Sequence, residues 1–287
     1  MNVGGITLDI KLICDSLCDI PDEIMAKDYL EMVPLTLIMD GKEYKDGVDI
    51  TKEEFYKMAM ESKEIPKTSQ ATYVQFKDAF DRALAEGKKV ICINGASTKS
   101  GTYQSAVLAK NDTDGEVHIF DTENLSLGAG QSVIRACDMI EEGLSVEEIL
   151  KNLEDVRDSA VVYFAPANLD YLKKSGRVTM AAAVIGNMLS IRPIFKMEKG
   201  EISIDGKVRG SKKMIAYLID KVVERNKDLS KITLTVGHGC NIEDFVKLAT
   251  EVENKLKDKV KKVLISKGGV CVCSHTGPDI IAVSFSR

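Results

Sequence analysis

Short runs of apolar, mostly β-branched residues alternate along this chain with longer stretches in which apolar residues recur every three or four positions. This alternation is typical of parallel strands connected by crossover helices. The expected strands of the first half span residues 10–14, 33–39, 89–94 and 117–121. Helices are expected to begin at Thr51, Thr72, Thr102 and about Ser126. We therefore predict an α/β fold whose N-terminal sheet is mainly parallel and flanked by helices.

The second half contains a predicted antiparallel hairpin, with arms at 191–197 and 201–204 around a Lys199-Gly200 turn. Further strands are expected at 160–165, 232–236, 262–266 and 279–285. Helical periodicity is found at 168–174, 180–189, 211–226 and 242–256. A hairpin beside crossover helices indicates a mixed C-terminal sheet.

The chain is long enough for two hydrophobic cores, because 287 residues exceed the size at which one core usually stops growing. A capping box at Ser145 to Glu148 opens a helix that runs to about Arg157 and leads out of the first half. We expect an N-terminal domain at 1–160 and a C-terminal domain at 161–287.

Charge and cysteine content limit the classes of function. A net charge of −5 argues against nucleic-acid binding through a broad basic face. Seven scattered cysteines do not form a disulfide framework and favour a reducing cytoplasm. No secretory signal is expected, and the most apolar stretch, 180–191, is too short for stable membrane insertion. We expect a soluble cytoplasmic protein.

Two segments rich in hydroxyl groups are candidate anion sites. Ser100, Gly101 and Thr102 follow a predicted strand and open a helix, where free N–H groups and the helix dipole favour a carboxylate or phosphate. Taken alone, Ser100 is better explained as a helix cap. A second pair, Thr68 and Ser69, lies in an expected loop before the Thr72 helix and is by itself an ordinary helix entry.

The segment Cys271-Val272-Cys273-Ser274-His275-Thr276-Gly277-Pro278 carries the third candidate. A zinc site there is not favoured, because no further Cys or His lies near in sequence and a strand could send both thiols into the core. His275 before the Gly-Pro turn is placed as a hydrogen-bond donor at a loop tip, although a structural role fits equally well. His118 is expected to be structural, whereas His238 at a strand end is a weaker site candidate.

Enzyme signatures are sparse. The sequence contains neither a Gly-rich phosphate loop with a following Lys nor a nucleophile-elbow serine. This disfavours a stand-alone kinase or hydrolase, and we expect no catalytic residue, metal or cofactor.

Taken in order, these segments resemble the DegV family of bacterial fatty-acid-binding proteins. The matching segments are 14–16, 33–35, 67–70, 100–106, 175–178, 191–194, 207–210 and 275–278. The resemblance implies a long-chain fatty acid such as palmitate, stearate or oleate in a tunnel between the domains. It implies that Thr68, Ser100 and His275 hold the carboxylate, with Ser69, Gly101 and Thr102 beside them.

The resemblance also implies a partner. In the family, the loaded carrier presents the carboxyl group to a separate ATP-dependent fatty acid kinase, which forms an acyl phosphate for phospholipid synthesis. Arg177 and Arg209 match arginines that look like partner-docking residues, although a single Arg beside a glycine turn is more often a solvated charge.

Physical chemistry agrees with a lipid ligand. An acyl chain of about sixteen carbons would gain on the order of 10 kcal/mol from burial before ordering costs. Suggested wall residues are Ala181, Ala182, Val184, Ile185, Met188 and Leu189. The chain departs from the family at Lys99, Ala71, Ser175 and Asp279, and Lys99 could alter head-group preference or point to solvent.

Two alternatives remain open from the sequence. One is an acyl- or phosphoryl-transfer enzyme that uses His275 or His238 as a general base or phosphate carrier. The other is a regulatory or interaction module whose bound lipid is incidental.

Overall fold

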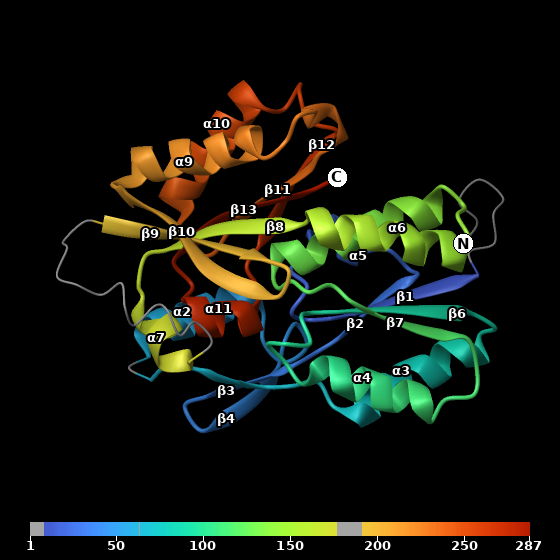
Figure 1. Ribbon diagram of the computed structural model, residues 1–287. Helices are drawn as coiled ribbons and strands as arrows, with labels where there is room; N and C mark the ends of the chain where they lie inside the picture. Colours follow the sequence, from blue (N-terminus) through green and yellow to red (C-terminus); the bar gives the residue numbers. More distant parts are fainter. Residues whose placement is uncertain (1–8, 63, 177–190) are drawn as a thin grey trace.

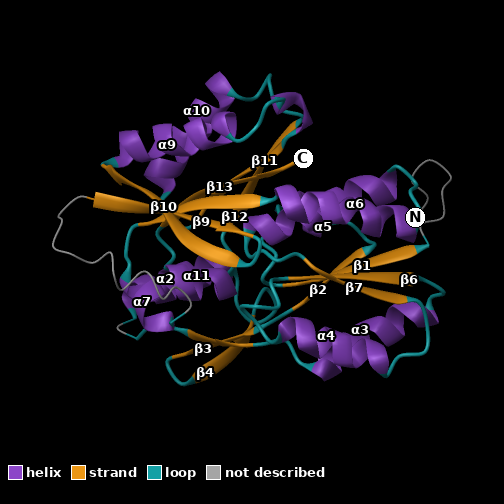
Figure 2. Ribbon diagram, viewed as in Figure 1, coloured by secondary structure: helices purple, strands orange, loops and turns teal. Residues whose placement is uncertain are grey.

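The computed structural model describes residues 9–62, 64–176 and 191–287. Figure 1 shows its helices and sheets stacked in layers from the bottom to the top of the view. Two sheets dominate the architecture, and a third, smaller sheet lies beside them (Figure 2).

The first sheet is parallel throughout, with strand order β2-β1-β6-β7. Its strands are β1 (Ile10–Asp15), β2 (Leu30–Val33), β6 (Lys89–Asn94) and β7 (Val117–Asp121). One face is covered by α3 (Tyr73–Ala85) and α4 (Thr102–Asn111), and the other by α5 (Leu127–Glu141) and α6 (Val146–Ser159) (Figure 1). A short helix, α1 (Asp22–Met25), follows β1.

The second sheet is mixed, with strand order β10-β9-β8-β13-β11-β12, and only the β11–β12 pair is parallel. Its strands are β8 (Val161–Pro166), β9 (Ile191–Glu198), β10 (Glu201–Arg209), β11 (Thr233–His238), β12 (Lys262–Lys267) and β13 (Ile280–Ser286). The outer face carries α9 (Ser211–Glu224) and α10 (Ile242–Lys255), and the 3-10 turn Leu229–Lys231 connects α9 to β11. This arrangement matches the expected mixed C-terminal sheet.

Helix α5 lies between the two large sheets and is buried along almost its whole length. Its Gln131 Nε2 donates to Thr235 Oγ1 at 3.1 Å and to the Ser284 carbonyl at 3.3 Å, while Ser286 Oγ donates to Gln131 Oε1 at 3.0 Å. A buried amide with all these partners is stabilising, whereas an unpaired one would be costly. Gln131 therefore connects the N-terminal helix layer to the C-terminal sheet.

The third sheet was not expected from the sequence, and it corrects the predicted strand at 33–39. The chain turns at Pro34 and Leu35, so β2 ends in the parallel sheet and β3 (Thr36–Met39) starts an antiparallel sheet with β4 (Lys42–Lys45) and β5 (Lys67–Ser69). Proline has no N–H to donate to a neighbouring strand and is disfavoured inside a central strand. This explains why the predicted strand is interrupted at Pro34.

Two further corrections concern the segments singled out for chemistry. Thr68 and Ser69 lie on strand β5 and not in a loop. Residues Val270–Thr276 form helix α11, so Cys271 and Cys273 are on a helix, and His275 is in its last turn. This segment has only seven residues, among them two valines and one threonine, which are β-branched. Because so short a helix is not stable by itself, tertiary packing decided this conformation.

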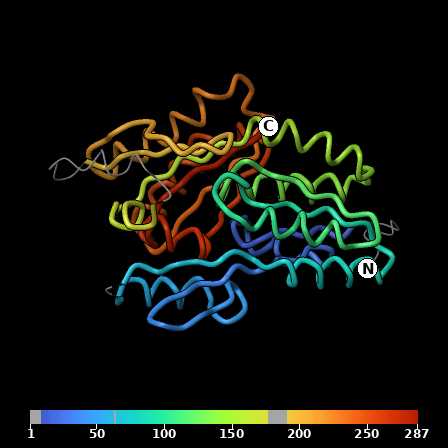
Figure 3. Tube along the Cα trace, turned by 60° about the horizontal axis from the view of Figure 1, so that its bottom comes forward, coloured from blue at the N-terminus to red at the C-terminus, as the bar shows by residue number. Residues whose placement is uncertain are grey.

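Helix α11 lies next to N-terminal elements although it lies near the C-terminal end of the sequence. It is the last helix, and it contacts α2 (Lys52–Glu61), β3 and β5, and also α7 (Asp170–Ser175). Figure 3 shows the red C-terminal segment reaching the blue and cyan N-terminal segments from a second direction. The fold thus brings segments from both ends of the chain together.

The predicted boundary at residue 160 stays a proposal. Helix α6 ends at Ser159 and β8 begins the mixed sheet at Val161, which agrees with a division at that point. The expected hairpin is present, with Lys199 and Gly200 at φ 49° and 74° in its turn, although its second arm extends to Arg209.

Candidate functional site

A cavity of about 390 Å³ opens where the N-terminal and C-terminal elements meet. This volume is within the range of about 300–1,000 Å³ for small-molecule sites. Its polar lining residues are Thr68, Ser69, Gln70, Lys99, Ser100, Gly101, His275 and Thr276. Its apolar lining residues are Leu17, Leu35, Leu125, Phe164, Leu172, Ile202 and Val272.

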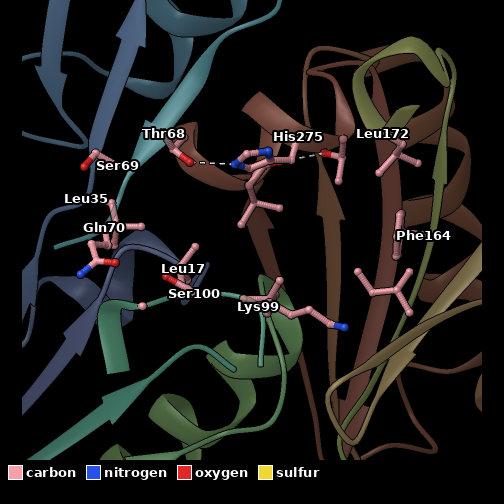
Figure 4. A pocket seen from close by; sticks show the side chains of 15 residues that line it. Leu17, Leu35, Thr68, Ser69, Gln70, Lys99, Ser100, Phe164, Leu172 and His275 are labelled. Atoms are coloured by element: carbon pink, nitrogen blue, oxygen red, sulfur yellow. Dashed lines mark hydrogen bonds between the residues drawn. The ribbon is translucent and has the colours of Figure 1, made fainter. Parts of the chain in front are cut away.

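Thr68 and His275 form the most direct link across the cavity. Thr68 is placed by β5, whose residues pair with β3 in the register Leu37↔Thr68. His275 is placed by the last turn of α11. Thr68 Oγ1 and His275 Nε2 are 2.7 Å apart, and Figure 4 shows the two side chains facing each other. Two hydrogen-bonding groups that are 207 residues apart in sequence therefore meet at one end of the cavity.

Ser100 lies at the same end, in the turn that leads from β6 into α4 (Figure 4). Its hydroxyl accepts from the Thr102 N–H at 3.2 Å and donates to Thr102 Oγ1 at 2.9 Å. The hydroxyl can turn its proton toward an incoming carboxylate and still accept from Thr102, because it has two lone pairs. Capping and anion binding are therefore compatible roles for Ser100.

Thr102 lies beneath the cavity and is not among its lining residues. It is fully buried, and its hydroxyl accepts from the Ala71 N–H at 3.3 Å as well as from Ser100. Thr102 thus holds two cavity-forming segments together. Its predicted place among the residues that bind the carboxylate stays a prediction.

Gln70 was missed as a site residue by sequence reasoning. Its Nε2 donates to Ser105 Oγ at 3.0 Å, and a Cβ added at Gly101 would collide with its side-chain amide. A glycine at 101 therefore leaves room for Gln70 at the cavity edge. The position of Gln70 directly after Thr68 and Ser69 was the available signal.

The polar end of the cavity is also its exposed end. Ser69 and Gln70 are exposed, whereas Leu17, Leu35 and Leu172 are buried. Burial of an acyl chain against such a wall is favourable, while a carboxylate needs donors or water. The arrangement suits an amphiphile whose acid group lies at the mouth.

A family model described as an uncharacterised protein of the DegV family matches residues 9–287. The chain belongs to the DegV family. A DegV domain-containing protein of Caldanaerobacter subterraneus is 37% identical over 283 residues, covering 97% of this chain and 99% of that protein.

Solved DegV structures share this fold. A DegV family protein from Thermus thermophilus, described for its fatty acid binding, has a TM-score of 0.89 at 30% identity and covers 97% of this chain and 99% of its own. A stearic acid-binding protein from Eubacterium ventriosum has a TM-score of 0.87 at 29% identity and covers 97% and 98%. The prediction of a parallel N-terminal sheet and a mixed C-terminal sheet in a DegV fold is confirmed.

The helix that carries His275 is held in place by two buried carboxylates from the N-terminal part. Asp19 Oδ1 accepts from the Gly269 N–H at 2.8 Å, and Asp46 Oδ2 accepts from the Cys271 N–H at 3.3 Å. Gly269 is the N-cap residue of α11 and Cys271 lies in its first turn, where the N–H groups of a helix have no partner within the helix. Ser126 Oγ also donates to Asp19 Oδ2 at 2.5 Å.

These carboxylates are unusually basic for aspartates. Burial raises the pKa of Asp19 to about 6, although nearby Lys52 and the hydrogen bond from Ser126 oppose the shift. Burial likewise raises the pKa of Asp46. The ionised form of Asp19 is therefore costly in the folded protein, and its hydrogen bonds only partly offset that cost.

A pH dependence of stability follows for Asp19. Because its folded pKa of about 6 exceeds the ordinary value of 3.8, the folded protein binds more protons than the unfolded chain between these values. The free energy of unfolding contributed by Asp19 should therefore fall as pH rises from about 4 to about 7. In Asp19→Asn, the amide oxygen can still accept from Gly269 and the amide NH₂ can donate to Ser126, without a charge.

We expect Asp19→Asn to gain stability over the wild type as pH rises through this window, by roughly 1–3 kcal/mol. Urea unfolding of both proteins at several pH values between 4 and 8 measures the difference. Titrating groups that do not interact with Asp19, such as His238, contribute equally to both proteins and leave the difference unchanged. A difference that is constant with pH would contradict the prediction.

The other histidines lie away from the cavity. His118 is on β7, with its Nε2 3.3 Å from Glu116 Oε1. His238 is buried within β11, stacks on Phe245 with a centroid distance of 3.9 Å, and lies with Nδ1 2.7 Å from the Gly239 carbonyl. Burial lowers the pKa of His238. His238 is not among the residues that line the cavity.

The cysteines of α11 have structural surroundings. Cys271 and Cys273 are fully buried, and burial raises the pKa of both thiols. Over residues 9–62, 64–176 and 191–287, no group of three or more His, Cys, Asp or Glu could hold a metal ion. In the same part of the chain, no helix is long and apolar enough to cross a bilayer.

The structure describes only some of the remaining residues that the sequence predicted for the site. Arg209 is exposed at the end of β10, an edge strand of the mixed sheet. Arg177 and the suggested wall residues at 181–189 lie outside the described residues.

Proposed function

We propose that this DegV protein binds a long-chain fatty acid, with the carboxylate at Thr68, Ser100 and His275 and the acyl chain along the apolar wall. The observation that carries the proposal is the convergence of these three side chains at the exposed polar end of one cavity. Ser69 and the backbone at Gly101 lie beside them. A carboxylate at this position would accept several hydrogen bonds, which offset the free-energy cost of removing it from water.

The relatives support this assignment. The Thermus thermophilus protein is described for fatty acid binding, and the Eubacterium ventriosum protein for stearic acid binding. Both cover 97% of this chain. The proposed ligand is palmitate, stearate, oleate or an acid of similar length.

Native mass spectrometry and lipid extraction of the purified protein test the proposal. We expect an acyl lipid to be carried through purification, and the delipidated protein to rebind oleate with one site. Absence of lipid together with no binding of oleate, stearate or palmitate would contradict it.

We further propose that the chain is a carrier and not an enzyme, and that it presents its carboxylate to a separate fatty acid kinase. Exposure of the polar end is consistent with access by a partner, and Arg209 and Arg177 are the proposed docking residues. Acyl phosphate formation by a fatty acid kinase, ATP and the loaded protein should fall in Arg209→Ala while oleate binding is unchanged. Turnover by the isolated chain, lost on His275→Ala, would favour the enzyme alternative.

A further inference from the structure

Lys99 places a cation in the wall of the cavity. Its backbone is tightly positioned, because the Lys99 and Ser100 N–H groups both donate to the Ala96 carbonyl, at 3.0 and 3.2 Å. The neighbouring Thr98 hydroxyl donates to the Gly200 carbonyl at the tip of the β9–β10 hairpin, at 3.3 Å. These hydrogen bonds fix the backbone on both sides of Lys99, so its side chain leaves the cavity wall at a defined position.

The ammonium group does not join the carboxylate-binding end. Figure 4 shows the Lys99 side chain extending away from Ser100 and from the Thr68–His275 pair, toward the side of the cavity formed by Phe164. Phe164 is buried and stacks on Phe195 with a centroid distance of 5.3 Å. Lys99 thus brings a positive charge to the part of the cavity that would hold the acyl chain.

This charge has no acidic partner in the cavity. None of the described lining residues is Asp or Glu, and no ion pair of Lys99 is found within residues 9–62, 64–176 and 191–287. Lys99 is only partly exposed. A methylene chain laid against the ammonium would remove water from it and supply no acceptor, which is unfavourable. An oxygen atom at that point of the ligand would accept a charge-assisted hydrogen bond.

We propose that Lys99 recognises a second oxygen-bearing group on the bound acyl chain, so that the ligand class is an oxygenated long-chain acid. Hydroxy acids and dicarboxylic acids share the required chemistry, which is an oxygen acceptor some distance from the first carboxylate. The inference rests on the proposed function, because it assigns the first carboxylate to Thr68, Ser100 and His275.

The test compares equilibrium binding of stearate, hydroxystearates with the hydroxyl at successive positions, and octadecanedioate to the delipidated full chain. We expect at least one oxygenated acid to bind roughly tenfold or more tightly than stearate, as a charge-assisted hydrogen bond predicts. Lys99→Met keeps the length of the side chain and removes the charge. It should bind that acid more weakly and stearate more tightly, which abolishes the preference.

Lys110→Met is the matched control, because Lys110 is an exposed lysine near the end of α4. It should keep the wild-type ratio of affinities. A wild-type preference for stearate over every oxygenated acid would overturn the inference, and so would a preference that survives in Lys99→Met. Failure of all acids to bind would instead contradict the proposed function, so the two results can be told apart.

Discussion

Replacing His275 with alanine is expected to weaken oleate binding by roughly 10- to 100-fold, because one donor of a charge-assisted hydrogen bond is worth about 1.5–3 kcal/mol. The imidazole faces Thr68 at 2.7 Å across the cavity, so its loss also removes the group that orients the Thr68 hydroxyl. Titration calorimetry on delipidated protein measures the change.

His118→Ala is the matched control, since His118 lies on β7 outside the cavity. It should bind oleate as the wild type does. Thr68→Val combined with His275→Ala should cost less than the sum of the two single changes, because the pair acts on one carboxylate. Wild-type affinity in His275→Ala would show that the head group is held elsewhere.

Replacing Asp19 with alanine is expected to lower both stability and affinity. The change leaves the Gly269 N–H and the Ser126 hydroxyl without their buried acceptor, at a cost of roughly 2 kcal/mol or more. The cost of burying the ionised carboxylate offsets part of this loss at neutral pH. Because Gly269 precedes the first turn of α11, we also expect His275 to lose its fixed position and oleate affinity to fall about tenfold.

Asp19→Asn distinguishes this positioning role from a general loss of stability. It restores both hydrogen bonds, so it should recover affinity as well as stability. Asp158→Ala is the control for the alanine change, because the Asp158 side chain is 65% exposed. Oleate affinity that stays at the wild-type level in folded Asp19→Ala would show that α11 does not depend on this carboxylate.

Helix boundaries and strand positions were largely predictable because their signals are local. The capping boxes at Thr51, Thr72 and Ser145 are present as hydrogen-bonded pairs with the residues three positions later. The buried strands β1, β6 and β7 are short apolar runs that need no knowledge of their neighbours. The same rule failed at 33–39, where apolar periodicity continues through Pro34 but the chain changes sheet.

The sequence predicted which residues belong to the candidate site better than it predicted how they are arranged in space. Thr68, Ser69, Ser100, Gly101 and His275 could be named from hydroxyl pairs, a helix start and the ordered resemblance to DegV proteins. Their approach to one another could not be derived from spacing, because β5, α4 and α11 belong to different parts of the chain. The apolar wall was missed for the same reason, since Leu17, Phe164 and Ile202 look like ordinary core residues in sequence.

Local patterning and residue order thus established the α/β class, the parallel and mixed sheets, and the family, because each depends on periodicity, caps and motifs within short stretches. Tertiary structure alone decided that 270–276 is a helix, that Asp19 and Asp46 hold its first turn, and that Lys99 faces the cavity. The physical reason is that a buried hydrogen bond or a cavity wall depends on which distant segments meet, and that is settled only when the sheets pack around α5.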